Sequence, residues 1–425
     1  MASESYVARV PELNRTATTY RYERWRALSA GVIESAGTTF LLLIAVRSLH
    51  AGPVAKAMVA AGGSVGLLLS PFFVSFVQSR GWATAQAASR FSFIGMFAFL
   101  LPTLFPTLPM FIFGGVVGLA MSAVSIPLLT QIYQENYPEQ ERGRLFSRTM
   151  MLRIGATALF SDVIGNAFAG RMEHFRWLLL AFAGAFALSS FCFRRIPSRP
   201  LTAAGGTHPL RALRFAREDR LFRLTLISWM FLGFGTLLMV PLRVEFLANT
   251  SKYGITLYGQ PLDEAMIAVL TAVIPNVVRL VLSPVWGWLF DRVNFFALRV
   301  ALNIGFALGV VTFFMSNSLS GLIVGAVIFG ISNAGGDVAW SLWVTKFAPP
   351  ARVADYMSVH VCFTGLRGVL APFIAFYLVA HHFPIQTLGW ISAGLICCAI
   401  LLLLPELKSD QKPRRASALV EEISE

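Results

Sequence analysis

The chain has 425 residues, of which 56% are hydrophobic and only 13% are charged. Soluble domains carry about a quarter of their residues as charged side chains, so this composition excludes an ordinary soluble domain. The net charge of +13 would favour nucleic-acid binding in a soluble protein, but here the basic residues lie in alternate short stretches between long apolar blocks. That arrangement is typical of a membrane protein whose basic loops lie on one side of the membrane, and we expect no nucleic-acid partner.

The cysteines and short motifs exclude several kinds of chemistry. All four cysteines lie in apolar blocks, which favours neither a disulfide framework nor a metal site. The sequence contains no Gly-x-x-x-x-Gly-Lys phosphate loop, no Cys/His cluster with metal-ligand spacing and no nucleophile elbow. We therefore expect neither an enzyme nor a protein with a cofactor or a bound metal.

Twelve apolar windows of about 20 residues predict membrane-spanning helices. They lie near residues 27–46, 54–78, 82–101, 107–131, 148–170, 175–195, 221–243, 263–290, 294–316, 318–346, 356–380 and 384–404. The stretch 196–220 contains Pro197 and Pro200 and then a basic stripe from Arg211 to Arg223. It is the expected linker between two sets of six spans, and its basic stripe is expected to lie on anionic membrane lipid.

Basic residues also set the expected orientation. Of the 35 Lys and Arg residues, 26 lie in or beside the N-tail (1–26), the even-numbered connections and the C-tail (405–425), and 6 lie in or beside the odd-numbered loops. Because loops rich in Lys and Arg stay in the cytoplasm, we expect both termini and the linker to be cytoplasmic. About 25 mostly polar residues precede the first span, so we expect no cleavable signal and a bacterial inner (plasma) membrane location.

The two halves share a sequence pattern. Ser70-Pro71 leads to a tight hairpin at Arg80-Gly81, and Ser283-Pro284 leads to a similar charged hairpin about half the chain later. Weaker echoes follow in the same order through both halves. The predicted fold class is therefore an all-α integral membrane protein with twelve transmembrane helices in two pseudo-symmetric six-helix bundles, residues 27–195 and 221–404.

The second hairpin resembles a known family signature. Gly287-Trp-Leu-Phe-Asp291-Arg292 resembles the Gly-x-x-x-Asp-Arg motif of the major facilitator superfamily of transporters, and residues 135–144 (ENYPEQERGR) are similar to that family's link between helices 4 and 5. The resemblance implies a secondary transporter whose helices 1, 4, 7 and 10 line a central cavity. It also implies that Gly287, Asp291 and Arg292 stabilise one state of the alternating-access cycle. In the first half Val74 and Gln78 replace the motif's Gly and Asp.

Six ionisable residues stand out inside the predicted spans. A charge near the centre of a bilayer costs roughly 2.5–3.5 kcal/mol even on lenient insertion scales, so each is a candidate functional residue. They are Glu34, Arg153, Asp162, Arg279, Asp337 and Arg367. Counting along the helices places four of them near the middle of the membrane, with Arg153 nearer the cytoplasm and Asp162 nearer the outside. The alternative is that these acids and arginines neutralise one another and only fix helix packing.

The types of these residues suggest their roles. Arg279 and Arg367 present planar forks suited to a carboxylate or phosphate, and Asp337, Asn333 and Trp340 are the other expected substrate-binding residues.

A buried carboxylate can change protonation as a cavity opens, so Glu34 and Asp337 are expected to couple transport to protons, with His360 two helical turns before Arg367 as a further relay. A histidine bonded to a neighbouring helix and aromatic packing are the plainer interpretations of His360 and Trp340.

These features predict a secondary active transporter, a proton symporter for a small anionic or zwitterionic organic solute, acting as a monomer by alternating access. The partners would be the solute, protons or another coupling ion, and membrane lipids. A proton-driven exporter of drugs or lipophilic metabolites is one alternative, favoured by the aromatic content and by Glu34 as an isolated acid. A ligand sensor that uses the same fold without transport is the other.

Overall fold

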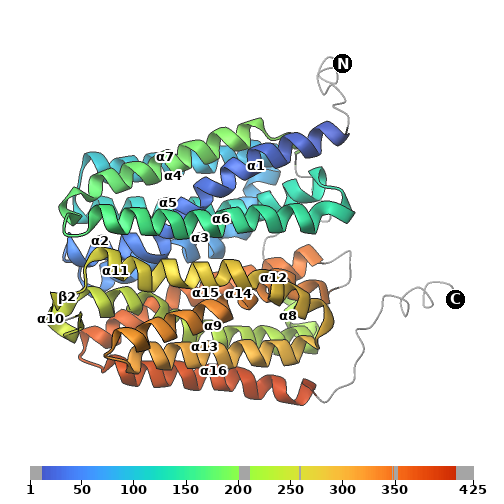
Figure 1. The fold of residues 1–425 in the computed structure, drawn as a ribbon. Helices are drawn as coiled ribbons and strands as arrows, with labels where there is room; N and C mark the ends of the chain where they lie inside the picture. Colours follow the sequence, from blue (N-terminus) through green and yellow to red (C-terminus); the bar gives the residue numbers. More distant parts are fainter. Residues whose placement is uncertain (1–11, 201–210, 258–259, 347, 349–352, 408–425) are drawn as a thin grey trace.

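The computed structural model describes residues 12–200, 211–257, 260–346, 348 and 353–407. Within these residues the chain forms twelve long helical rods that run nearly parallel or antiparallel to one another (Figure 1). The rods of the first half are α1 (Glu12–Ser35) continued by η1 (Ala36–Phe40) and α2 (Leu41–Arg47), α3 (Pro53–Ser79), α4 (Thr84–Leu104), α5 (Leu108–Asn136), α6 (Glu139–Phe168) and α7 (Phe175–Arg195).

The second half repeats this layout. Its rods are α9 (Arg220–Ala248), α11 (Glu264–Ala268) continued by η4 (Val269–Val273) and α12 (Ile274–Arg292), α13 (Phe295–Met315), α14 (Leu319–Leu342), α15 (Val353–Ala380) and α16 (Ile385–Leu407). Short elements connect the rods, namely η2 (Met172–His174), η3 (Arg211–Arg214), α8 (Phe215–Glu218), α10 (Thr250–Tyr253), η5 (Trp343–Lys346) and the antiparallel pair β1 (Thr256–Leu257) and β2 (Gln260–Pro261).

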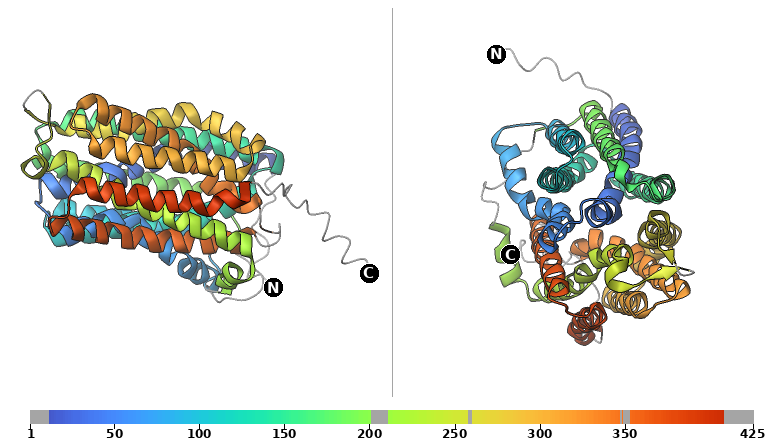
Figure 2. Two further views of the ribbon diagram at one scale, coloured as in Figure 1. Left: turned by 90° about the horizontal axis from the view of Figure 1, so that it is seen from below. Right: turned by 90° about the vertical axis from the view of Figure 1, so that its left-hand side faces the viewer.

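The two halves lie side by side. A view along the rods shows the first-half helices gathered on one side and the second-half helices on the other (Figure 2). The rod of α1 begins and α16 ends at the same end of the molecule, which we call the terminal end, and the other end is the opposite end (Figure 1). The fold is the expected all-α arrangement of twelve helices.

Eleven of the rods are long and apolar enough to cross a membrane, and the exception is α6. The sequence predicts a span at 148–170, and the helix there is present, but it begins earlier and carries Arg153, Asp162 and Asn166 along its length. These polar side chains lower the hydropathy of the helix. The first rod also differs from expectation, since α1 begins at Glu12 instead of near residue 27.

The early start of α1 has a packing reason. Its polar first turns pack on the end of α5, where Thr19 and Glu23 are buried. Asn136 donates to Thr19 at 3.0 Å, and Tyr133 donates to the Glu23 carboxylate, which also pairs with Arg26 at 2.6 Å. Buried polar residues can continue a helix when their side chains find hydrogen-bond and ion-pair partners in this way.

Two seams join the halves. One lies between α3 and α15, where a β-carbon at Gly365 would collide with the backbone of Leu67 and Leu68, so only glycine permits this approach. The other lies between α6 and the rod of α11, η4 and α12, where Gly165 packs on Ala265 and Ala268. Residues 1–11, 201–210 and 408–425, which belong to the expected N-tail, linker and C-tail, lie outside the described residues.

Candidate functional site

Four of the six expected intramembrane charges form one cluster between the halves. Glu34 of α1 and Arg153 of α6 come from the first half, and Arg279 of α12 and Asp337 of α14 come from the second. Arg279 donates from Nη1 to Glu34 Oε1 at 2.6 Å and from Nε to Asp337, while Arg153 Nε lies 3.0 Å from Glu34 Oε2. The two acids and two arginines balance in charge, and Glu34 bridges the two guanidinium groups.

Local sequence explains why these side chains meet. A β-carbon at Gly31 would collide with the carbonyl oxygen of Arg153 and lie 2.8 Å from the β-carbon of Ala156, so glycine lets α1 cross α6 closely one turn before Glu34. Thr157 then donates to the Gly31 carbonyl at 3.1 Å. This crossing holds the Glu34 carboxylate beside Arg153.

Two π-helical segments flank the cluster. One, η1, directly follows the α1 segment that carries Glu34, and the other, η4, precedes the α12 segment that carries Arg279. They touch across the halves, where the hydroxyls of Thr39 and Thr271 are 3.2 Å apart and buried. Such π-bulges occur often at functional sites because they rotate side chains out of helical register.

The cluster is partly open. Side-chain exposure is 32% for Arg153, 20% for Glu34 and 29% for Asp337, but only 6% for Arg279. Arg279 is therefore the buried centre of the cluster, further fixed by Asn276 Oδ1 at 3.2 Å, and the acids and Arg153 form its accessible rim. A planar guanidinium shared by two carboxylates is also a group that a ligand carboxylate or phosphate can bind.

Ion pairs close the opposite end of the molecule. Lys56 of α3 binds Glu245 of α9 at 2.7 Å, and Arg47 of α2 lies 3.8 Å from Glu264 of α11. The same Glu264 accepts a hydrogen bond from the Gly170 amide at 2.7 Å. Apart from the central cluster, every ion pair between the halves within the described residues lies at this end. The structure thus shows a state closed at the opposite end.

Arg367 and His360 belong to a second cluster inside the second half. Arg367 donates to the carbonyl of Trp229 in α9 and fills the space beside Gly233, where a β-carbon would collide with it. His360 packs on Trp229 and Trp340, with ring centroids 5.6 Å and 5.3 Å apart. The expected substrate-binding arginines are therefore separated, with only Arg279 in the central cluster and Trp340 beside His360.

The remaining expected residues lie apart from the central cluster. Asp162 is half-buried near the surface, where Asn166 bonds to its carbonyl at 2.8 Å. Asn333 is half-buried on α14, one turn before Asp337. At the end of α12, a β-carbon at Gly287 would meet open space and the exposed Arg292 lies 4.7 Å over the Trp288 ring. The side chain of Asp291 lies outside the described part of the chain.

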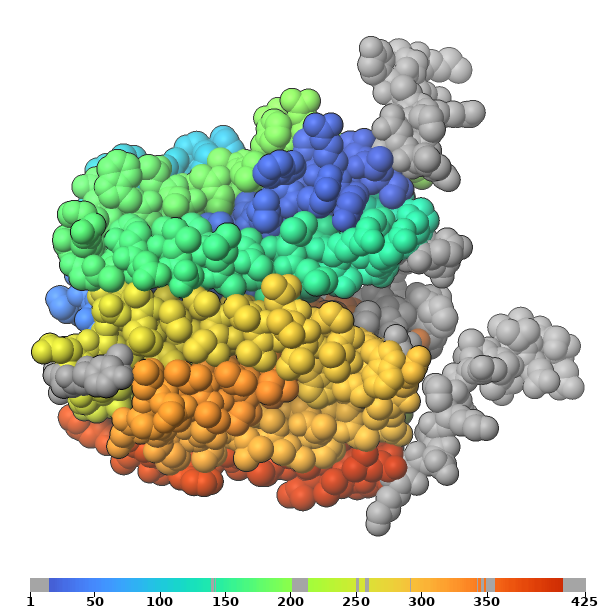
Figure 3. Space-filling view, in the orientation of Figure 1, coloured from blue at the N-terminus to red at the C-terminus, as the bar shows by residue number. Residues whose placement is uncertain are grey.

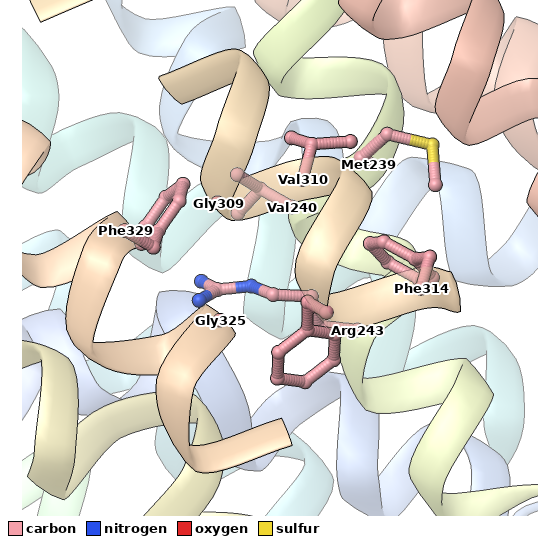
Figure 4. Close-up of a pocket in the computed structure, with 9 residues that line it drawn as sticks. Met239, Val240, Arg243, Gly309, Val310, Phe314, Gly325 and Phe329 are labelled. Atoms are coloured by element: carbon pink, nitrogen blue, oxygen red, sulfur yellow. The ribbon is translucent and has the colours of Figure 1, made fainter. Parts of the chain in front are cut away.

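Sequence reasoning missed two buried arginines. Arg299 of α13 is fully buried with its charge 3.5 Å from the Trp229 ring centre, and among the described residues none of its three guanidinium nitrogens has a hydrogen-bond partner. Arg243 of α9 is buried 4.1 Å from the Phe329 ring centre beside a cavity of about 10 Å³ (Figure 4), and its Nε and Nη1 have no hydrogen-bond partner within the described part of the chain. The count of Lys and Arg places both in or beside connections between spans, because nothing in their spacing predicts burial.

Comparisons with known proteins agree with this architecture. The Major Facilitator Superfamily family model matches residues 262–422. An uncharacterised MFS-type transporter of Bacillus subtilis (strain 168), YuxJ, is 21% identical over 357 residues, which cover 81% of this chain and 86% of the relative.

Solved structures show the same fold. The nucleoside transporter NupG has a TM-score of 0.73 at 14% identity, covering 92% of this chain and 99% of its own. A D-xylose–proton symporter has a TM-score of 0.61 at 17% identity, covering 92% and 96%. The human organic anion transporter MFSD10 has a TM-score of 0.61 at 15% identity, covering 92% and 99%. The family match over residues 262–422, the relative aligned over most of its length and the shared fold together show that this chain is similar to transporters of the major facilitator superfamily.

Proposed function

We propose that this chain is a secondary active transporter that carries a small anionic or zwitterionic organic solute together with a proton, by alternating access. The observation that carries the proposal is the position of Glu34 between the guanidinium groups of Arg153 and Arg279, one from each half. A bound anion in the place of this carboxylate would touch both halves at once.

Charge balance suggests the order of events. While Glu34 is ionised it satisfies both arginines, and an added anion would leave the cluster with one excess negative charge. Protonation of Glu34 removes its charge and frees two guanidinium groups, which are suited to a carboxylate or phosphate. Proton and anion therefore enter the site together, and the second carboxylate, Asp337, keeps Arg279 oriented.

The link to conformation follows from the same contacts. The Glu34–Arg279 ion pair ties α1 to α12, and Thr39 and Thr271 touch just beyond it. If the solute took the place of the Glu34 carboxylate, the contact between the halves would run through the solute. This contact would then be lost when the solute leaves the site. In this proposal the protein acts as a monomer in the bacterial inner membrane with cytoplasmic termini.

The test begins with substrate class. The purified protein in detergent is heated with anionic, zwitterionic, neutral and cationic metabolites, beside Arg279→Lys and the control Arg176→Lys, at an exposed arginine. Lysine keeps the charge but loses the planar fork. We expect one anionic or zwitterionic class to raise the melting temperature of the wild type and of Arg176→Lys but not of Arg279→Lys. Stabilisation only by lipophilic cations, unchanged in Arg279→Lys, would contradict the proposal and favour a drug exporter.

The coupling is tested in proteoliposomes with the solute so found. We expect Glu34→Gln to abolish uptake driven by a pH gradient while retaining exchange of labelled for unlabelled solute. The reason is that the glutamine amide, like the protonated acid, carries no charge, and it cannot release a proton. Glu141→Gln, which alters an exposed carboxylate paired with Arg144, is the matched control and should transport normally. Gradient-driven uptake by Glu34→Gln at the wild-type rate would refute proton coupling through this residue.

A further inference from the structure

A long apolar groove lies on the side of the first half. It has a volume of about 1190 Å³, its floor is formed by α1 and its walls by α6 and α7, and Leu280 of α12 closes one edge. The lining is almost wholly apolar and includes small residues such as Ala156 and Gly184. Figure 3 faces this side of the molecule, with α6 running below α1 and α7.

The groove has a charged end. Arg24 of α1 and Arg148 of α6 line it together with Tyr20, and both arginines are exposed. Neither arginine pairs with a carboxylate among the described residues, and Arg24 stacks only on Tyr20, at 5.1 Å from the ring centre. Both belong to the parts of α1 and α6 nearest the terminal end, so a single rim of the groove is cationic.

The length of the groove matches one leaflet of a membrane. Its lining on α6 runs from Arg148 to Val163, which corresponds to about 22 Å of helix at 1.5 Å per residue. Half of a bilayer, headgroups included, is about 20–22 Å thick. With the arginines at headgroup depth, the apolar part extends to about the middle of the membrane.

We propose that this groove binds one anionic phospholipid, with an acyl chain along α1, α6 and α7 and its phosphate on Arg24 and Arg148. The match in length, the apolar lining and the unpaired arginines at one rim all favour this occupant. Leu280 follows Arg279 directly and comes from the other half, so the lipid lies against the seam that opens when α6 and α12 separate. This proposal does not depend on which solute is carried.

Gly184 offers a way to fill the groove without disturbing the protein. A β-carbon at Gly184 would meet nothing within 4 Å, although the residue lines the groove. Leucine there is expected to project into the path of the acyl chain. Gly394 of α16 is equally free of neighbours and lies outside the groove, so Gly394→Leu is the matched control.

The experiment titrates phosphatidylglycerol or phosphatidylcholine into delipidated full-length protein in neutral detergent and follows lipid binding by native mass spectrometry. We expect phosphatidylglycerol to bind more tightly than phosphatidylcholine to the wild type. An arginine near an anionic lipid surface contributes about 1 kcal/mol, so Arg24→Gln with Arg148→Gln should weaken phosphatidylglycerol binding by about twenty-five-fold. Gly184→Leu should weaken both lipids, and Gly394→Leu neither.

A second pair of substitutions distinguishes lipid binding in the groove from a general attraction of anionic lipid to positive charge. Arg80 and Arg90 lie near the same end but stack on Phe76 and Trp82, outside the groove. The double variant Arg80→Gln with Arg90→Gln removes the same net charge and should bind phosphatidylglycerol as the wild type does. Equal loss in both double variants, or equal binding of the two lipids by the wild type, would overturn the proposal.

Discussion

At the scale of residues, the second half accommodates buried arginines in two different ways. Arg279 is balanced by two carboxylates, whereas Arg243, Arg299 and Arg367 have no ion pair within the described residues. Aromatic faces and a backbone carbonyl take the place of carboxylates, with Phe329 against Arg243 and Trp229 beside the other two. A cation over an aromatic ring gains about 2 kcal/mol when desolvated, less than the several kcal/mol that burial of an ion costs.

This imbalance leads to a stability prediction for Arg243. Replacing it with methionine removes the buried charge and keeps a long apolar side chain beside Phe329, so Arg243→Met should increase the stability of the folded protein by about 1–3 kcal/mol. A thermal melt in detergent measures the effect as a higher melting temperature. Arg176→Met, at an exposed arginine bonded to the Thr103 carbonyl, is the control and should change little. A lower melting temperature in Arg243→Met would show that the guanidinium has a partner that stabilises it.

Residue types alone predicted part of the candidate site. The rarity of charge inside apolar spans was enough to single out Glu34, Arg153, Arg279 and Asp337, which the structure brings together. The same reasoning grouped Arg367 with Arg279, and here the sequence was insufficient. Whether a side chain faces the central cavity or the core of its own half depends on its direction around the helix. A span that is apolar all round does not reveal that direction.

At the scale of elements, the opposite end is held closed by ion pairs between rods. Lys56 and Glu245 are both largely buried, and Asn249 further binds Glu245 at 3.0 Å. From the sequence Lys56 entered only the count of basic residues in the odd-numbered loops, because a pairing with Glu245, about 190 positions away, depends on how the halves dock. Hydropathy likewise located eleven rods well and α6 less well, since α6 carries Arg153, Asp162 and Asn166 along its length.

Loss of this ion pair should open the opposite end more often. Lys56→Gln leaves the buried Glu245 carboxylate without its counter-charge, which disfavours the closed state. Thr39 is fully buried at the seam, so the labelling rate of Thr39→Cys by a maleimide reports opening. A shift of about 1.4 kcal/mol would raise that rate roughly tenfold.

The reversed pair is the control for the labelling experiment. Lys56→Glu combined with Glu245→Lys restores opposite charges at the same place and should bring labelling of Thr39→Cys back toward the starting rate. If Lys56→Gln leaves the rate unchanged, the ion pair does not hold the closed state.

At the scale of the whole molecule, the two halves meet along tight seams and share one charge cluster. The α3 to α15 seam requires glycine at position 365, and the α6 seam ends at the ion pairs of the opposite end. The duplicated hairpin and the spacing of apolar blocks predicted the two sets of six helices. They could not predict which state of the transport cycle the chain adopts, because states differ in docking between halves and not in the helices themselves.

The central claim is that an anion and a proton occupy the Glu34 cluster together. Isothermal titration calorimetry of the stabilising ligand, repeated in buffers of different ionisation enthalpy, counts the protons bound with it. Linkage predicts uptake of about one proton per anion by the wild type near neutral pH, and none by Glu34→Gln, which binds the same ligand without a proton. Binding to the wild type with no proton uptake, or with the same uptake in Glu34→Gln, would contradict the account.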